Sequence, residues 1–241
     1  MRAIGTPLIL VNFKAFREAA GQKAVQKAKI AEKVSEEYGI CIIVAPSFVD
    51  IAPVAQEVSI PVFAQHVDPV DPGPRTGHVP PELVREAGAV GTLLNHAEKK
   101  LNFLEAIADA IYLCRKVGLL TLVCCDKVLA CRLVVHLGPD MFAFEPPELI
   151  GTGKSVSVAQ PHTLRRAMLT AKQVRPDIIA LCGAGVSCGS DVSAALRLGA
   201  EGVLVGSVVT SPEFDRILAN MAESALKAWE EREEGLGEAE D

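Results

Sequence analysis

The stretch IIALCGAGVSCGSDVSAALRLGAEGVLVGS, residues 178–207, shows the organisation that decides the fold. It contains two short apolar runs, Ile178–Leu181 and Gly202–Val205, and a turn of small residues follows each. Runs that are apolar almost throughout are typical of parallel strands, because both faces of such strands are covered. The segment between the runs is long enough for a connecting helix. The stretch therefore predicts one strand–helix–strand unit of an α/β fold.

Six further runs of the same kind precede this unit, so the chain has eight. Amphipathic segments follow nearly every run, and in Ala19–Glu37 apolar residues recur at helical spacing. Eight β-then-α units in 241 residues predict α/β class and a single closed parallel (β/α)8 barrel. An open doubly wound sheet is the alternative, but it usually has a glycine-rich first turn, which Asn12-Phe13-Lys14 is not. The other expected strands are Leu8–Phe13, Ile40–Ala45, Pro61–Gln65, Val90–Leu94, Leu119–Cys124 and Met141–Phe144, and further expected helices are Pro80–Ala87, Leu101–Val117 and Thr163–Val174.

Composition narrows the class of partner. The formal net charge of −6 disfavours a nucleic-acid partner held by a basic face. Polar residues interrupt the first apolar run early, and no run approaches the ~20 residues that span a bilayer, so we expect a cytoplasmic protein without a membrane partner. The seven cysteines include no C-x-x-C pair, which favours buried free thiols over a redox or metal role. We expect neither a cofactor nor a metal.

The sequence predicts one domain followed by a C-terminal tail. Residues 1–229 are expected to form the barrel, and the acidic segment 230–241 is expected to be a flexible, solvated extension.

Polar residues end several of the apolar runs. Barrels of this type carry their chemistry at the carboxyl ends of the strands, so these residues are candidates for a site. One polar residue at a strand end means little, but a lysine, a histidine and a carboxylate on separate strands form a much more specific set. The set comprises Asn12 and Lys14, Gln65 and His66, Asn95 and His96, Glu145, Gly183-Ala184-Gly185 and Gly206-Ser207.

Five spaced motifs, in order between about Pro7 and Val209, resemble the triosephosphate isomerase family, whose fold is the TIM barrel. The glutamate motif Phe144–Gly153 and the short chain are similar to the archaeal branch of that family. Several motifs in the right order are more specific than any one of them alone. The motifs are Val11-Asn12-Phe13-Lys14, Asn95-His96-Ala97-Glu98-Lys99, Phe144–Gly153, Cys182–Ser187 and Gly202–Ser207.

The resemblance implies an enzyme that interconverts dihydroxyacetone phosphate and D-glyceraldehyde 3-phosphate in glycolysis and gluconeogenesis. It implies that Glu145 is the base that moves a proton between two carbons. His96, near a helix start, would be a neutral electrophile, and Lys14 would supply a fixed positive charge that Asn12 orients. Read by position alone, each of these residues has an ordinary alternative: a solvated glutamate, a packed core histidine, a surface lysine and a turn asparagine.

The small-residue turns would bind the phosphate of the substrate. Gly185, Gly206 and Ser207 let backbone N–H groups approach an anion, although such turns also serve as plain connectors. The resemblance implies that Ile150 and Gly151 belong to a lid that covers the phosphate and excludes water.

Two more features follow from the resemblance. Glu98 would pair with Lys14 or a neighbouring backbone group, or be a first-turn helix carboxylate. The loop Asp68–Val79 would reach into a second subunit and bring Thr76 near the partner's Asn12 and Lys14, or would be an exposed surface loop. The short archaeal form suggests a homotetramer, with a dimer as the alternative.

One residue departs from the family pattern. Ala97 stands where serine is usual, which puts the resting position of Glu145 and the turnover rate in question. The rival functions are a barrel that has lost catalysis and a different phosphate-binding barrel such as an aldolase. Retention of Asn12, Lys14, His96 and Glu145 opposes the first, and the absence of a lysine inside a mid-barrel strand opposes the second.

Overall fold

The computed structural model describes residues 4–237, and eight parallel strands run through this part of the chain. They pair in the order β2-β1-β8-β7-β6-β5-β4-β3, and a parallel bridge between Val44 and Val62 joins the two ends of the sheet. The sheet therefore closes nearly completely, and the predicted (β/α)8 barrel is confirmed. The strands are β1 (Leu8–Asn12), β2 (Cys41–Ala45), β3 (Phe63–Ala64), β4 (Gly91–Leu94), β5 (Leu120–Cys125), β6 (Met141–Phe144), β7 (Ile179–Cys182) and β8 (Gly202–Val205).

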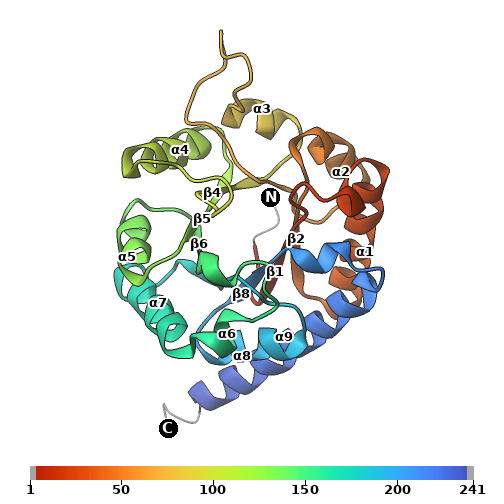
Figure 1. The fold of residues 1–241 in the computed structure, drawn as a ribbon, viewed down its shortest axis with the longest axis vertical. Coiled ribbons are helices and arrows are strands. Elements are labelled where there is room, and N and C mark those ends of the chain that lie inside the picture. Colours follow the sequence, from red (N-terminus) through yellow and green to blue (C-terminus); the bar gives the residue numbers. More distant parts are fainter. Residues whose placement is uncertain (1–3, 238–241) are drawn as a thin grey trace.

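The helices form a ring around the strands (Figure 1). Their apolar faces pack on the outer face of the sheet, as expected for a barrel whose strands are covered on both sides. None of the helices in the described chain is both long and apolar enough to cross a membrane. The helices are α1 (Gln22–Tyr38), α2 (Ile51–Glu57), α3 (Pro81–Glu86), α4 (Leu104–Lys116), α5 (Val128–His136), α6 (Val156–Ala159), α7 (Pro161–Val174), α8 (Gly189–Arg197) and α9 (Phe214–Gly237), with short 3-10 helices at Arg17–Ala19, Phe48–Asp50, Pro147–Leu149 and Ser207–Thr210.

Side chains alternate along each strand between two cores. Leu8 and Leu10 of β1 belong to a cluster inside the barrel, whereas Ile9 and Val11 belong to the larger cluster between strands and helices. This period of two is the ordinary geometry of a strand. The same alternation decides whether the side chain directly after a strand points toward the barrel axis or toward the helices. It therefore decides which residues can reach a site at the end of the barrel.

The barrel interior is tight where Gly91 faces Phe63. A Cβ at position 91 would lie 2.6 Å from Cε1 of the Phe63 ring, so the missing side chain on β4 makes room for the large one on β3. We expect Gly91→Ala to lower the free energy of unfolding by roughly 1–3 kcal/mol, the usual cost of overpacking a core. Urea unfolding followed by circular dichroism measures this loss.

Phe63→Leu provides the matched control for Gly91→Ala. Because leucine is smaller, the double variant should lose less stability than the sum of the two single losses. Strictly additive losses would contradict the proposed overlap.

The C-terminal segment differs from its expected conformation. α9 continues through Gly237, so residues 230–237 are helical in the structure and not a frayed extension. Side-chain contacts accompany these turns: Trp229 Nε1 donates to Glu233 Oε1 at 2.8 Å, and Arg197 on α8 pairs with Glu231 at 2.8 Å. The remainder of the predicted tail, residues 238–241, lies outside the described residues.

Candidate active site

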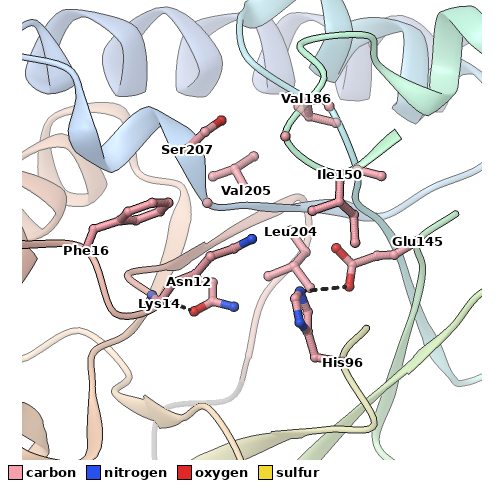
Figure 2. Close-up of a pocket in the computed structure, with 14 residues that line it drawn as sticks. Asn12, Lys14, Phe16, His96, Glu145, Ile150, Val186, Leu204, Val205 and Ser207 are labelled. Atoms are coloured by element: carbon pink, nitrogen blue, oxygen red, sulfur yellow. Dashed lines mark hydrogen bonds and ion pairs between the residues drawn. The ribbon is translucent and has the colours of Figure 1, made fainter. Parts of the chain in front are cut away.

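A pocket opens at the carboxyl ends of the strands and encloses about 500 Å³, including open solvent at its mouth. All nine residues that the sequence proposed as catalytic or phosphate-binding line it (Figure 2). They come from segments far apart in the chain, which only a closed barrel brings together. The nine are Asn12, Lys14, His96, Glu145, Ile150, Gly151, Gly185, Gly206 and Ser207.

Backbone strain is concentrated around this pocket. Three non-glycine residues of the described chain have a positive φ: Lys14 at 49°, Asn95 at 57° and Ala184 at 70°. Each follows β1, β4 or β7 closely, and two of the three line the pocket. Left-handed conformations are unfavourable for residues with a Cβ, and their occurrence together marks functional sites. The strain therefore points to the same edge of the barrel as the side chains.

Glu145 follows β6 directly and is buried at 5% exposure. Its backbone N–H donates to the carbonyl oxygen of Cys125 at 2.8 Å, which fixes the start of the side chain. Burial raises the pKa of the Glu145 carboxyl, while the nearby Cys124 thiol and the Lys14 ammonium oppose that rise. Oε2 is buried and makes no hydrogen bond within the described residues. A carboxylate kept from water and left unpaired can accept a proton from a bound molecule.

His96 presents its Nε2 to Glu145, with 3.7 Å between Nε2 and Oε2. The backbone N–H of Glu98 donates to His96 Nδ1 at 3.2 Å. Glu98 Oε2 lies 3.9 Å from the same nitrogen, which is too far for a hydrogen bond, so the N–H contact decides the tautomer. Because Nδ1 accepts, the proton of the neutral imidazole is on Nε2 and faces the pocket.

One expectation about His96 was wrong. No helix begins beside it: a single turn follows, closed by the Lys99 N–H on the His96 carbonyl at 2.8 Å, and α4 starts only at Leu104. The group that acts on the ring is therefore the individual N–H of Glu98 and not the end of a helix.

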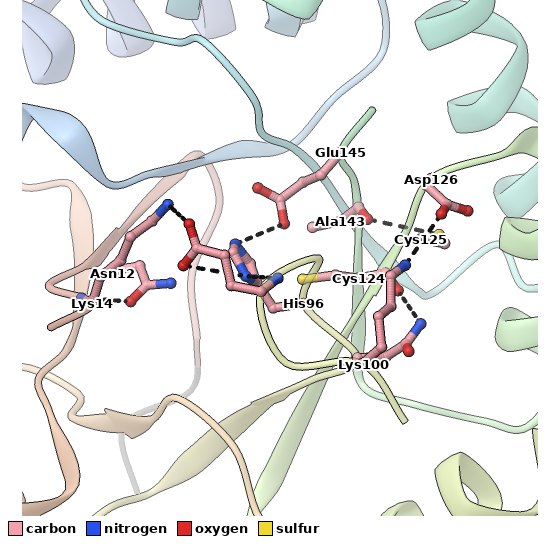
Figure 3. A network of polar contacts seen from close by, with 11 residues as sticks. Asn12, Lys14, His96, Lys100, Cys124, Cys125, Asp126, Ala143 and Glu145 are labelled. Carbon is pink, nitrogen blue, oxygen red and sulfur yellow. Dashed lines mark hydrogen bonds and ion pairs between the residues drawn. The ribbon is translucent and has the colours of Figure 1, made fainter. Parts of the chain in front are cut away.

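Lys14 lines the pocket and pairs with Glu98, with 2.6 Å between Nζ and Oε1 (Figure 3). The Lys14 N–H donates to Asn12 Oδ1 at 2.9 Å, and Gln65 Nε2 donates to the carbonyl oxygens of Lys14 and Ala45, each at 2.9 Å. These contacts hold the strained turn after β1. Of the two alternatives for Glu98, the structure has the ion pair with Lys14.

Three glycines at the last two strands leave space that a side chain would fill. A Cβ at Gly183 would collide with the Glu145 carboxylate, and one at Gly185, where φ is 74°, would collide with the Lys154 carbonyl. A Cβ at Gly206 would lie 2.9 Å from Lys14 Cε. These three glycines therefore leave room for the Glu145 carboxylate, the Lys154 carbonyl and the Lys14 side chain.

The segment after Glu145 forms a short loop held by hydrogen bonds within its own backbone. The 3-10 helix at Pro147–Leu149 is followed by Ile150, whose N–H donates to the Pro147 carbonyl at 3.2 Å. Gly151 and Gly153 have φ of 74° and 72°, conformations that glycine adopts without strain. This compact loop thus brings Ile150 and Gly151 to the wall of the pocket.

Glu98 and Thr76, the two predicted supporting residues, do not line the pocket; Glu98 pairs with Lys14, whereas Thr76 lies on an exposed loop. Residues 71–78 are all exposed and project from the barrel beside α3 (Figure 1). Asp68 clasps the base of this loop, because its Oδ2 accepts from the Val79 N–H at 2.7 Å and its Oδ1 lies 3.2 Å from His66 Nε2. His66 is buried in this clasp, in keeping with a structural role.

Sequence reasoning missed several residues that shape the pocket. Cys124 on β5 lies beside the Glu145 carboxylate, and strand register is the signal that could have found it, since Cys124 pairs with Ala143, two residues before Glu145. Gln65 was noted at a strand end without a role. The unassigned lining residues are Phe16, Val186, Leu204 and Val205.

A closed parallel barrel with a buried carboxylate, a neutral imidazole and an ammonium around one small pocket defines the class of (β/α)8-barrel enzymes that use acid–base chemistry. The family model described as "Triosephosphate isomerase" matches residues 7–221. The chain is 48% identical over 202 residues to a triosephosphate isomerase of Methanocaldococcus jannaschii, covering 84% of this chain and 92% of that protein. It is 49% identical over 205 residues to one of Methanopyrus kandleri, covering 84% and 90%.

A solved structure supports the fold independently. The crystal structure of triosephosphate isomerase from Bartonella henselae superposes with a TM-score of 0.72 at 14% identity and covers 91% of this chain and 98% of that one. The extent of the family match and the identity to the archaeal proteins settle membership. The chain belongs to the triosephosphate isomerase family.

Proposed function

We propose that this chain interconverts dihydroxyacetone phosphate and D-glyceraldehyde 3-phosphate through an enediolate, in glycolysis and gluconeogenesis in the cytoplasm. The observation that carries the proposal is that Glu145 Oε2 faces His96 Nε2 at 3.7 Å in a pocket that Lys14 also lines. A base, a neutral hydrogen-bond donor and a cation around one cavity are the groups that proton transfer beside a carbonyl needs.

In the first step Glu145 removes a proton from the hydroxyl-bearing carbon next to the carbonyl. The electrons of that C–H bond form the carbon–carbon double bond of the enediolate, and the carbonyl electrons move onto oxygen. His96 Nε2–H donates a hydrogen bond to this oxygen, and the Lys14 ammonium stabilises its negative charge. The protonated Glu145 then returns the proton to the neighbouring carbon. The hydroxyl proton of the enediolate passes through His96 to the former carbonyl oxygen, so that the other oxygen becomes the new carbonyl. Two hydrogens thus move within the substrate, and nothing is consumed.

The rest of the pocket would bind the phosphate and exclude water. Backbone N–H groups at Gly185, Gly206 and Ser207 suit an anion because the side chains there are absent or small and leave the approach open. Lys14 is the only permanent cation among the residues that line the pocket. Ile150 and Gly151 of the lid would cover the phosphate, which strengthens the electrostatic contacts inside and suppresses loss of phosphate from the enediolate.

A coupled assay tests this function directly. D-glyceraldehyde 3-phosphate is the substrate, and a reductase specific for dihydroxyacetone phosphate reports the product through oxidation of its nicotinamide cofactor. Product formation supports the isomerase. Binding of the substrate without turnover supports the barrel that has lost catalysis, and carbon–carbon bond chemistry without isomerisation supports a different phosphate-binding barrel.

The raised pKa of Glu145 leads to a prediction about pH. Only the ionised carboxyl can act as a base, so kcat/KM should fall as pH decreases through that pKa, at a pH above the one at which an exposed glutamate titrates. The substrate phosphate also titrates, at about pH 6, and would add a second step to the pH profile of kcat/KM. A pH profile of Glu145→Gln separates the two, since only the phosphate step remains in that variant. Full activity at the pH where exposed glutamates protonate would contradict the prediction.

We also propose that the protein is a homo-oligomer and favour a tetramer over a dimer. The exposed loop 71–78 supports one contact, through which Thr76 would approach the partner's Asn12 and Lys14. Exposed apolar side chains support a second contact on the outside of the barrel, because large exposed apolar patches mark interfaces. Phe103 directly precedes α4 and Leu104 is its first residue, whereas Leu129 and Leu133 lie on α5.

Thr76→Arg tests the first of these contacts. A bulky charge at the loop tip should shift the oligomer toward smaller species in multi-angle light scattering, and it should lower kcat/KM by about tenfold or more as the turn at Lys14 loses support. Gln173→Arg, at an exposed position on α7, adds the same charge elsewhere and should leave the mass unchanged. An unaltered mass for Thr76→Arg would rule out the loop as an interface.

A further inference from the structure

Two cysteines outside the pocket lie in direct contact. The sulfur of Cys125, at the end of β5, is 2.7 Å from the sulfur of Cys131, on α5. Both side chains are buried, at 2% and 0% exposure, in the core between strands and helices. Both are free and buried, as the sequence predicts, but the other five cysteines make no comparable thiol–thiol contact in the described residues.

The alternation of β5 separates this pair from the catalytic pocket. Cys124 belongs to the cluster inside the barrel, on the side of Glu145, whereas Cys125 belongs to the outer cluster. The two sulfurs point to opposite sides of the strand (Figure 3). A bond at Cys125 would therefore form behind the strand, away from the substrate.

A covalent link between Cys125 and Cys131 would stabilise α5, because the start of this helix has few stabilising features of its own. It has nine residues, its N-cap residue Lys127 provides no side-chain cap, and its first turn contains no acidic residue. Short helices without these features depend on tertiary packing for their stability. Cys131 makes the first hydrogen bond of the helix, from its N–H to the Lys127 carbonyl at 2.9 Å. A link at this residue would hold the start of α5 against the sheet.

From the contact, the burial and the weak helix start, we propose that Cys125 and Cys131 are an oxidisable pair that forms a disulfide and fastens α5 to β5. A peroxide is the oxidant. One thiol loses its proton, and its thiolate attacks hydrogen peroxide to give a sulfenic acid and hydroxide, which takes up that proton as water. The second thiol likewise loses its proton, and its thiolate attacks the sulfenic sulfur, displacing hydroxide that leaves as a second water. Two thiols and one peroxide thus yield one disulfide and two waters. The neighbouring thiol resolves the sulfenic acid before further oxidation.

The test uses the folded full-length protein treated with hydrogen peroxide and then alkylated in denaturant. Trypsin cleaves after Lys116, Lys127 and Arg132, so Cys125 and Cys131 fall on the separate peptides 117–127 and 128–132. We expect these two peptides to be joined without reductant and to separate with it. Fragmentation between Cys124 and Cys125 identifies which sulfur is bonded.

The melting temperature gives the second readout. Closing this seven-residue loop should raise it by about 5 °C relative to the reduced protein. Cys131→Ala and Cys125→Ala should show neither the joined peptide nor the increase, whereas the control Cys114→Ala, which removes a lone buried thiol of α4, should show both. If the wild-type peptides stay separate, or carry oxygen on unjoined sulfurs, or if Cys125→Ala still gives a joined peptide through Cys124, the proposal is overturned. None of these measurements depends on the isomerase activity.

Discussion

Glu145→Gln is expected to lower kcat by about 10²–10⁴-fold, the range that a single acid–base group contributes. The amide has the size of the carboxylate and fits the same space beside Gly183, but it cannot accept the substrate's proton. Because glutamine also lacks the charge that burial disfavours, the variant should fold at least as stably as the wild type. The loss should therefore appear in turnover and not in folding, which steady-state kinetics and thermal melting measure together.

Glu145→Asp tests position instead of chemistry. It keeps the carboxylate and retracts it by one methylene, and a displacement of that size costs about 10²-fold. We expect the loss mainly in kcat, with little change in KM, because the base contacts the reacting carbon in the transition state and adds little to ground-state binding. Glu223→Gln removes a carboxylate from an exposed position on α9 and should leave both constants unchanged. Unchanged turnover in either Glu145 variant would eliminate this residue as the base.

Most of the fold could be predicted, because strands that are buried on both faces appear in the sequence as continuous runs of apolar residues. β6 was expected and found at Met141–Phe144, and β8 at Gly202–Val205. The third strand is shorter than expected, with only Phe63 and Ala64 in the ladder, although the Val44–Val62 bridge continues the pairing. Strand edges depend on neighbours across the sheet, which a local apolar run does not specify.

Residues of the site could be predicted only where a charged or polar side chain directly follows an apolar strand. Residues such as Lys14 and Glu145 are polar interruptions of apolar runs and stand out in a sequence. Phe16 and Cys124 do not, because an aromatic residue in a loop and a cysteine in a strand are ordinary core types. The turn after His96 was also missed: its hydrogen bond from Glu98 depends on the backbone path between β4 and α4.

Lys14→Met is expected to reduce kcat/KM by about 10²–10³-fold, the cost of removing one preorganised donor to a developing oxyanion. Methionine keeps much of the stem that packs against Gly206, so the change removes the ammonium with little change in volume. The positive φ at position 14 strains either side chain equally, and the half-exposed pair with Glu98 contributes little to folding. The free energy of unfolding should therefore change by less than about 1 kcal/mol.

The reason for so large an effect on activity is that the substrate and the enediolate of the proposed reaction are both anionic, while the pocket residues include no other permanent cation. Without Lys14, the charge that develops on oxygen faces the Glu98 carboxylate and the His96 ring alone. Inhibition by inorganic phosphate should weaken in parallel, since that ion reports ground-state anion binding without the reaction. Lys33→Met, at an exposed position on α1, matches the charge change and should behave as wild type. If Lys14→Met bound phosphate and turned over substrate as the wild type does, the pocket would not work through this cation, and the proposed stabilisation of the enediolate would fail.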